Sequence, residues 1–292
     1  MKKGSITQLF TVLCFAVAIG LEIVLSTVFS SMYSAGQMSE KGYVYLSYLL
    51  PQVSYILVIS VFLAIQRVPI SKVFRVENVR PIPYLYMILI ALGLFFVALL
   101  PNLYLQNAIQ TSGSSSTVLL PPMENAGEIT IAVILICILP AIGEEMMFRK
   151  TFCEGMKGNN EWVIVLLGGL FFSLTHLNLV QTVHQFILGC VLCFLYLRTG
   201  NITLTMIAHF LNNLLALFIE RWTGSFLDWG SITTFIVAFF VGLAALTAGL
   251  LLVWKRTKKT VSGEAKVAPY TIGMIVFVGV AWAVSAVASF FG

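Results

Sequence analysis

Residues 129–149 read ITIAVILICILPAIGEEMMFR. The first part of this stretch is apolar, and with its neighbours it approaches the ~20 residues that a helix needs to cross a bilayer. It nevertheless ends in two adjacent glutamates, Glu144 and Glu145, followed by Arg149. Charged groups in a membrane helix are costly and usually serve a function or meet a partner. The stretch therefore predicts a membrane helix that carries a polar site.

The composition of the whole chain points to a membrane protein. Of its 292 residues, 59% are hydrophobic and only 10% are charged, whereas soluble domains average about 25% charged residues. Five cysteines are too few for a secreted disulfide scaffold, and the large apolar content excludes a disordered chain. We expect an all-α fold, a polytopic transmembrane helix bundle.

Nine segments are candidate spans, so we expect about eight or nine membrane helices. They cover residues 7–30, 44–66, 82–102, 129–148, 162–177, 180–197, 202–219, 231–254 and 269–291. The first segment resembles a signal peptide, but its apolar run is too long and no convincing cleavage site follows, so we expect an anchor. No clear repeat divides the chain, and residues 1–292 are expected to form a single membrane domain.

The basic residues predict the orientation of these spans. Fifteen of the 17 Lys and Arg residues fall on one set of alternate connections, and only Lys41 and Arg221 fall on the other. Because basic loops stay in the cytoplasm, we expect a cytoplasmic N-terminus in a bacterial plasma membrane. The same distribution accounts for the net charge of +5, so we expect no nucleic-acid partner. The fifteen are Lys2, Lys3, Arg67, Lys72, Arg75, Arg80, Arg149, Lys150, Lys157, Arg198, Lys255, Arg256, Lys258, Lys259 and Lys266.

Most polar residues within the spans belong to the fourth to seventh, roughly residues 125–220. Side chains four residues apart share one face of a helix. Glu145 and Arg149 have this spacing and predict an ion pair, while Glu144 points about 100° away and is free for another task. Phe172 precedes His176 by the same interval, which places its ring beside the imidazole.

The remaining polar pair, His209 and Asn213, also shares one helical face. Spans four and five are joined near residues 158–160, and Glu144 and His176 lie at similar distances from that turn. A helical hairpin would therefore hold them at similar depth. We expect Glu144, His176 and His209 to converge in a cavity that is open to the cytoplasm.

Small residues in the spans predict packing rather than chemistry. Gly169 and Ser173 form a small-x-x-x-small pair, which permits close approach of another helix. Cys190 and Cys193 form a C-x-x-C within an apolar span, where we expect small core residues and neither a disulfide nor a zinc site.

One carboxylate, two imidazoles and a carboxamide best fit hydrolysis. Glu144 could accept a proton from a water molecule, and His176 could orient the same water or share the proton. His209 and Asn213 could donate hydrogen bonds to the oxyanion that develops on a peptide carbonyl. No serine, threonine or cysteine is placed obviously beside a base, so a covalent nucleophile is less attractive.

A metal ion is the alternative to this cofactor-free mechanism. Glu144, His176 and His209 would satisfy a catalytic zinc site with an open position. The chain lacks H-E-x-x-H, in which one helix supplies two ligands and the base. Spacing does not decide between the two, so we expect no cofactor and keep zinc as the alternative.

Three ordered motifs resemble those of a known family. Glu144-Glu145-x-x-x-Arg149, Phe172-x-x-x-His176 and His209-x-x-x-Asn213 look like the motifs of the CPBP (Abi) family. This family includes the type II CAAX prenyl endopeptidases and bacteriocin-processing or immunity proteins. Each motif alone is weak, but the three in order on apolar helices are fairly specific. The resemblance covers spans four to seven, the expected catalytic core at residues 125–220.

The resemblance implies an intramembrane peptidase that cleaves a membrane-associated protein or peptide, with lipidated or CAAX-like substrates among the candidates. It assigns water activation to Glu144 and His176, and the oxyanion hole to His209 and Asn213. Supporting roles fall to Glu145, Arg149 and Phe172. The prenyl endopeptidase branch is described as glutamate-dependent and metal-independent, although the family was long classed as metalloproteases.

Two other function classes remain open. The first is a non-catalytic membrane partner, such as a bacteriocin immunity or scaffolding protein. The second is a proton-coupled transporter, which would more often show pseudo-repeated halves, and no such symmetry is visible. The sequence does not assign a role to Glu22 or His184. Glu22 could face the cavity or pair with a polar group in the bundle, and His184 could be structural or line the cavity.

Overall fold

The structure is a computed structural model that describes residues 3–65, 84–111, 120–222 and 232–291, except residues 259, 260, 262 and 264. Within these residues the fold is all-helical, as expected. The first three helices are α1 (Lys3–Ser34), α2 (Glu40–Ile65) and α4 (Tyr84–Thr111). A run of short helices then covers residues 126–156. The later helices are α8 (Glu161–Thr175), α9 (Thr182–Thr199), α10 (Ile202–Trp222), α11 (Ile232–Arg256) and α12 (Pro269–Phe291).

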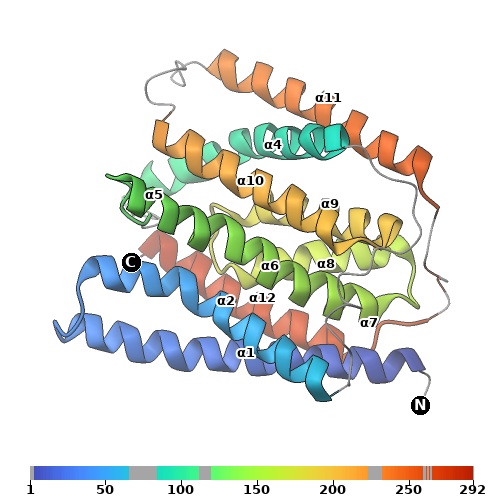
Figure 1. Cartoon of the computed structure of the whole chain (residues 1–292), viewed down its shortest axis with the longest axis horizontal. Helices are drawn as coiled ribbons and strands as arrows, with labels where there is room; N and C mark the ends of the chain where they lie inside the picture. The colour runs from blue at the N-terminus through green and yellow to red at the C-terminus, as the bar shows by residue number, and fades with distance from the viewer. Residues whose placement is uncertain are drawn as a thin grey trace.

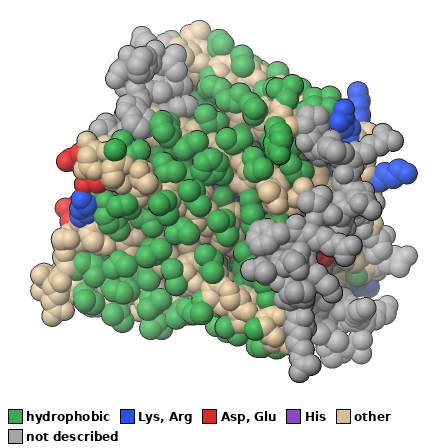
Figure 2. Space-filling model, viewed as in Figure 1, with side chains coloured by type: hydrophobic (Ala, Val, Ile, Leu, Met, Phe, Trp, Pro, Cys, Tyr) green, Lys and Arg blue, Asp and Glu red, His purple; other side chains and the backbone are tan. Residues whose placement is uncertain are grey.

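The helices agree with the expected spans. In the described part of the chain, seven helices are long and apolar enough to cross a membrane, and two further apolar stretches, Glu161–Thr175 and Ile202–Phe218, are shorter. Val17, Phe240 and Val280 lie on three different helices and are each about 60% exposed. Hydrophobic side chains cover much of the face in Figure 2, with charged groups towards its edges. The chain is therefore an integral membrane protein.

The two ends of the bundle differ in charge. The N-terminal end of α1, the turn at residues 157–160, the C-terminal end of α11 and the N-terminal end of α12 lie at one end, which we call the basic end (Figure 1). The turns at residues 35–39 and 176–181 and the C-terminal end of α12 lie at the other, which we call the distal end. Successive long helices thus run alternately between the two ends, as expected of membrane spans.

Two of the fifteen residues used to predict orientation are not loop charges. Arg149 is fully buried and Arg198 is 6% exposed, and both pair with glutamates of the bundle. Lys41, at the distal end, pairs with Glu128. Among the residues that the structure describes, the remaining basic residues still favour the basic end, seven against two. Lys2, Arg67, Lys72, Arg75, Arg80 and Lys259 lie outside the described residues, as do the side chains of Lys3 and Arg221.

The helix of residues 126–156 is not a regular α-helix. It consists of α5 (Ala126–Ala132), the π-helix η1 (Val133–Ile138), α6 (Leu139–Glu145), the π-helix η2 (Met146–Cys153) and α7 (Glu154–Met156). Such π-helical segments are rare and are frequently found at functional sites. Because Glu144 and Glu145 end α6, the paired glutamates of the first motif stand where the helix changes register.

Aromatic and small residues pack the helices around these glutamates. Phe148 is fully buried, and its ring centre lies 5.0 Å from that of Phe15 and 4.9 Å from that of Phe172. Helices α8 and α9 are in extensive contact. A Cβ added at Gly169 of α8 would lie 2.9 Å from the backbone nitrogen of Cys190, so the close approach predicted for this position is confirmed.

Candidate active site

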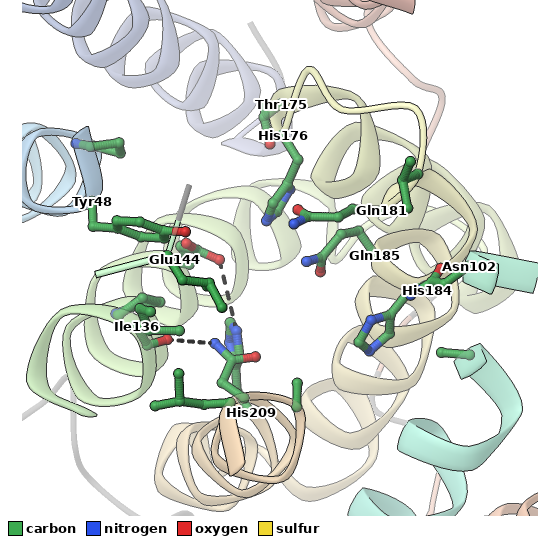
Figure 3. A pocket seen from close by; sticks show the side chains of 18 of the residues that line it. Tyr48, Asn102, Ile136, Glu144, Thr175, His176, Gln181, His184, Gln185 and His209 are labelled. Atoms are coloured by element: carbon green, nitrogen blue, oxygen red, sulfur yellow. Dashed lines mark hydrogen bonds and ion pairs between the residues drawn. The ribbon is translucent and has the colours of Figure 1, made fainter. Parts of the chain in front are cut away.

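A cavity of about 720 Å³ lies among the helices. Its walls come from α1, α2, α4, the helix of residues 126–156, α9, α10 and α11, together with the end of α8. All four residues expected to be catalytic line it, and Figure 3 shows three of them by name. The structure therefore brings Glu144, His176, His209 and Asn213 to one cavity, although their catalytic roles stay predictions.

The Glu144 carboxylate lies at the centre of this arrangement and is 8% exposed. Its Oε1 accepts a hydrogen bond of 2.8 Å from Gln52 Nε2. Its Oε2 has no hydrogen-bond partner among the described residues and lies 3.9 Å from His209 Nε2. That distance is longer than a direct hydrogen bond. One carboxylate oxygen is thus fixed by the protein, and the other is buried without a hydrogen bond from the described residues.

The ion pair predicted between Glu145 and Arg149 is confirmed. Arg149 Nε and Nη2 donate to the two carboxylate oxygens at 2.9 and 3.2 Å, and both side chains are fully buried. Arg149 also lies over the ring of Phe172, 5.3 Å from its centre, and Nη1 lies 3.6 Å from Cys193 Sγ. A bidentate pair of this kind holds the carboxylate in one orientation.

Glu145 in turn orients His209. Its Oε1 lies 3.0 Å from His209 Nδ1, and because a carboxylate paired with arginine only accepts, the Nδ1–H donates. The neutral imidazole then has an unprotonated Nε2, and the imidazolium carries a proton there. Glu145 and Arg149 therefore support the site by fixing the ring whose Nε2 faces Glu144.

Asn213 is held by the irregular helix. Its Nδ2 donates to the carbonyl of Ile136 at 2.9 Å, a contact drawn in Figure 3. In an α-helix the carbonyl of Ile136 would accept a hydrogen bond from the backbone N–H of residue 140. That residue is Pro140, which has no N–H, so the carbonyl can accept from a side chain instead. An amide nitrogen has two protons. With one given to Ile136, the other is available to the cavity.

His176 ends α8 as its C-cap. Its Nδ1 lies 2.8 Å from the carbonyl of Phe172, which accepts the proton and leaves Nε2 as an acceptor in the neutral ring. The Phe172 ring centre lies 4.9 Å from that of the imidazole, so the predicted packing of the two rings is confirmed. Leu177 follows with a φ of 48°, a left-handed conformation that is uncommon outside glycine, and the chain turns away there.

Three lining residues extend the site beyond the residues expected to act. Gln52 of α2 was not predicted to be a site residue. It is a polar side chain within an apolar span, which is the signal that identified the other site residues. A Cβ added at Gly143 would lie 2.6 Å from Gln52 Oε1, so glycine beside Glu144 makes room for this contact. His184 lines the cavity with its Nε2 3.2 Å from Asn212 Oδ1. Glu22 of α1 also lines it.

The alternative zinc site would use Glu144, His176 and His209 as its ligands. Among the residues that the structure describes, no group of three His, Cys, Asp or Glu side chains is arranged to hold a metal ion. Glu144, His176 and His209 face one cavity without forming such a group. The structure therefore offers no preformed ligand set for zinc in the described part of the chain.

The cavity lies between the middle of the bundle and the distal end. The lining residues come from segments 47–55 of α2, 95–106 of α4 and 209–217 of α10, which are nearer the distal end, and from residues 175–185 at that end. The 15 residues of α8 span about 22 Å and carry His176 away from the basic end. The expected opening of the cavity to the cytoplasm stays a prediction.

The fold and the site define a polytopic helical membrane protein with glutamate and histidine side chains inside its bundle. Residues 126–215 match the family model described as Type II CAAX prenyl endopeptidase Rce1-like. The match covers about a third of the chain, includes all three motifs and confirms the predicted resemblance to CAAX proteases. It supports a hydrolase of the protease class. No curated protein and no solved structure matches the chain.

Proposed function

We propose that this protein is an intramembrane endopeptidase that hydrolyses a peptide bond in a membrane-associated protein or peptide without a metal cofactor. One observation carries the proposal: Glu144, His176, His209 and Asn213 line a single cavity within an apolar bundle. The Rce1-like match over the same helices supports a protease. If cleavage does not depend on these residues, the experiment below would instead favour a non-catalytic membrane partner.

In the proposed reaction Glu144 is the general base. A water molecule at Oε2, the oxygen without a protein partner, gives a proton to the carboxylate as its oxygen attacks the substrate carbonyl. His176 Nε2 accepts a hydrogen bond from the second O–H of this water and so orients it, and this O–H remains on the attacking oxygen. The C–N bond then breaks while protonated Glu144 returns its proton to the departing amine.

His209 and Asn213 stabilise the oxyanion in this scheme. Asn213 offers the Nδ2 proton that is not given to Ile136. His209 offers Nε2–H as the imidazolium, because Nδ1–H is donated to Glu145. Two donors aimed at a developing oxyanion in a site shielded from water account for a large share of catalysis in other hydrolases.

We further propose that the cavity faces the outer side of the membrane. Once Arg149 and Arg198 are set aside, the sequence still has thirteen basic residues in the alternate connections that include the N-terminus, which favours a cytoplasmic location for the basic end. The cavity is lined from the distal halves of the helices. A substrate would then be an exported or membrane-anchored peptide that enters from the outer leaflet.

The experiment compares the peptides in membranes that contain the wild-type chain, Glu144→Ala, His176→Ala or the control Glu40→Gln. Glu40 is an exposed carboxylate at the start of α2 and does not line the cavity. We expect uncleaved precursors to accumulate with Glu144→Ala and His176→Ala but not with Glu40→Gln. Unchanged peptide profiles in both variants, at normal membrane levels of the protein, would overturn the proposed function.

A further inference from the structure

Glu22 is an acidic residue of the cavity wall. It lies in the second half of α1, is half-buried and lines the same cavity as Glu144. Among the described residues no hydrogen bond or ion pair of its carboxylate is found. Three other glutamates of the bundle each have a cationic partner: Glu145 with Arg149, Glu154 with Lys157, and Glu161 with Arg198.

The rest of the cavity wall shows the same excess of acceptors. Four buried oxygens of its lining residues have no hydrogen-bond partner among the described residues: Gln52 Oε1, Asn102 Oδ1, Glu144 Oε2 and Gln185 Oε1. Gln52 and Glu144 are more than nine-tenths buried. The orientation of the Gln52 amide is set by its bond to Glu144, because only the nitrogen can donate there. None of the described lining residues is Lys or Arg.

The Glu22 carboxylate is complementary to a group that donates hydrogen bonds and carries positive charge. Buried polar atoms are normally paired, and an ionisable residue inside a membrane usually marks a ligand path or a functional partner. A peptide main chain supplies N–H groups for the carboxamides. A carboxylate needs more than that, because its best partner is an ammonium or guanidinium group.

We propose that Glu22 forms a substrate subsite for a cationic nitrogen near the scissile bond. The nitrogen belongs to a Lys or Arg side chain or to a free α-ammonium group. The inference rests on the proposed peptidase function and adds a substrate class to it. Because Glu22 lies in α1, this subsite is outside residues 126–215, the segment that matches the protease family.

The same charges disfavour an anionic substrate. A free carboxylate a few residues beyond the cleaved bond would enter a wall that carries Glu22 and Glu144, with no Lys or Arg among its described residues. Like charges brought together in a partly desolvated site repel strongly. Peptides with a basic residue near the cleaved bond are therefore favoured over peptides with an acidic residue there.

The test uses the full chain in lipid nanodiscs and a set of synthetic 16-residue peptides. Each peptide has an apolar centre, and one position at a time carries Lys, norleucine or Glu; the N-terminus is either free or acetylated. Mass spectrometry identifies the cleaved bonds and their rates. We expect Lys at one position relative to the cleaved bond to raise kcat/KM about tenfold to a hundredfold over norleucine, with Glu the poorest.

The Glu22 variants assign this preference to the residue. Glu22→Gln should remove the preference for Lys while cleavage of norleucine peptides continues, and Glu22→Lys should reverse it towards Glu. Glu40→Gln serves as the control and should behave as the wild type. If the preference appears only for peptides with a free N-terminus and disappears on acetylation, the α-ammonium is the cation that Glu22 binds.

Two results would overturn the inference, and they are distinguishable. Cleavage by the wild type without any positional preference for Lys, or with a preference that Glu22→Gln leaves intact, contradicts the subsite but leaves the peptidase. Failure of the wild type to cleave any peptide of the set contradicts the peptidase function and the subsite together.

Discussion

The contact between Gln52 and Glu144 gives a sharp prediction about the catalytic base. Gln52→Leu keeps a similar side-chain volume and removes the 2.8 Å hydrogen bond from Nε2 to Oε1. A hydrogen bond to a charged group is worth about 1.5–3 kcal/mol. If this bond is needed to hold the carboxylate against the water, its loss lowers kcat by about tenfold to a hundredfold, since 1.4 kcal/mol is about tenfold.

The assay measures kcat and KM separately for the purified chain, because an effect on the base should appear in kcat. Gln106→Leu is the matched control: Gln106 is another carboxamide in the cavity wall, and it belongs to α4. Gly143→Ala is a second perturbation of the same contact, because its new Cβ would lie 2.6 Å from Gln52 Oε1. The double variant of Gln52→Leu and Gly143→Ala should therefore lose less activity than the sum of the losses, in free energy, of the two single variants.

A wild-type kcat in Gln52→Leu would refute this reasoning. So would an equal loss in Gln106→Leu, since a general change in cavity polarity would then explain both results. Thermal unfolding in detergent checks that each variant is folded, and we expect Gln52→Leu to unfold at a lower temperature than the wild type because the buried Glu144 Oε1 loses its hydrogen bond.

Three further predictions concern the ion pair, the oxyanion hole and the orientation. Glu145→Gln leaves Arg149 fully buried without its counter-charge, so the free energy of unfolding should fall by about 3–5 kcal/mol, measured by denaturation in detergent; an unchanged stability would contradict the role of the pair. Asn213→Ala should lower kcat about 10²–10³-fold with a smaller change in KM, and an unchanged kcat would remove it from the oxyanion hole. A cysteine introduced at Gln37, in the exposed turn at the distal end, should react with a membrane-impermeant maleimide in intact cells, and protection until the cells are broken would reverse the proposed orientation.

Local spacing predicted the parts of the site that lie on one helix. The pair of Glu145 with Arg149 and the packing of Phe172 on His176 follow from a separation of four residues, and the structure confirms both. The helices themselves were predictable because long apolar runs leave the backbone few alternatives in a bilayer. These features depend on contacts between residues that are close in the sequence, so residue spacing is enough to predict them.

Features that depend on packing between distant helices were harder to predict. Gln52 meets Glu144 across 92 positions of the chain, and no spacing rule links them. Arg198 looked like a loop charge but is buried against Glu161, because the ends of α8 and α9 pack together. The side on which the cavity lies depended on where α8 begins and ends, a matter of a few residues.

The central claim is that Glu144 activates water for peptide hydrolysis without a metal. Its most direct test is cleavage of a precursor found in the Glu144→Ala membranes, by purified protein reconstituted in vesicles and extensively treated with chelator. The account predicts that the wild type retains its rate and that Glu144→Gln loses at least about a thousandfold in kcat. Cleavage by Glu144→Gln at the wild-type rate, or loss of wild-type activity that zinc restores, would contradict it.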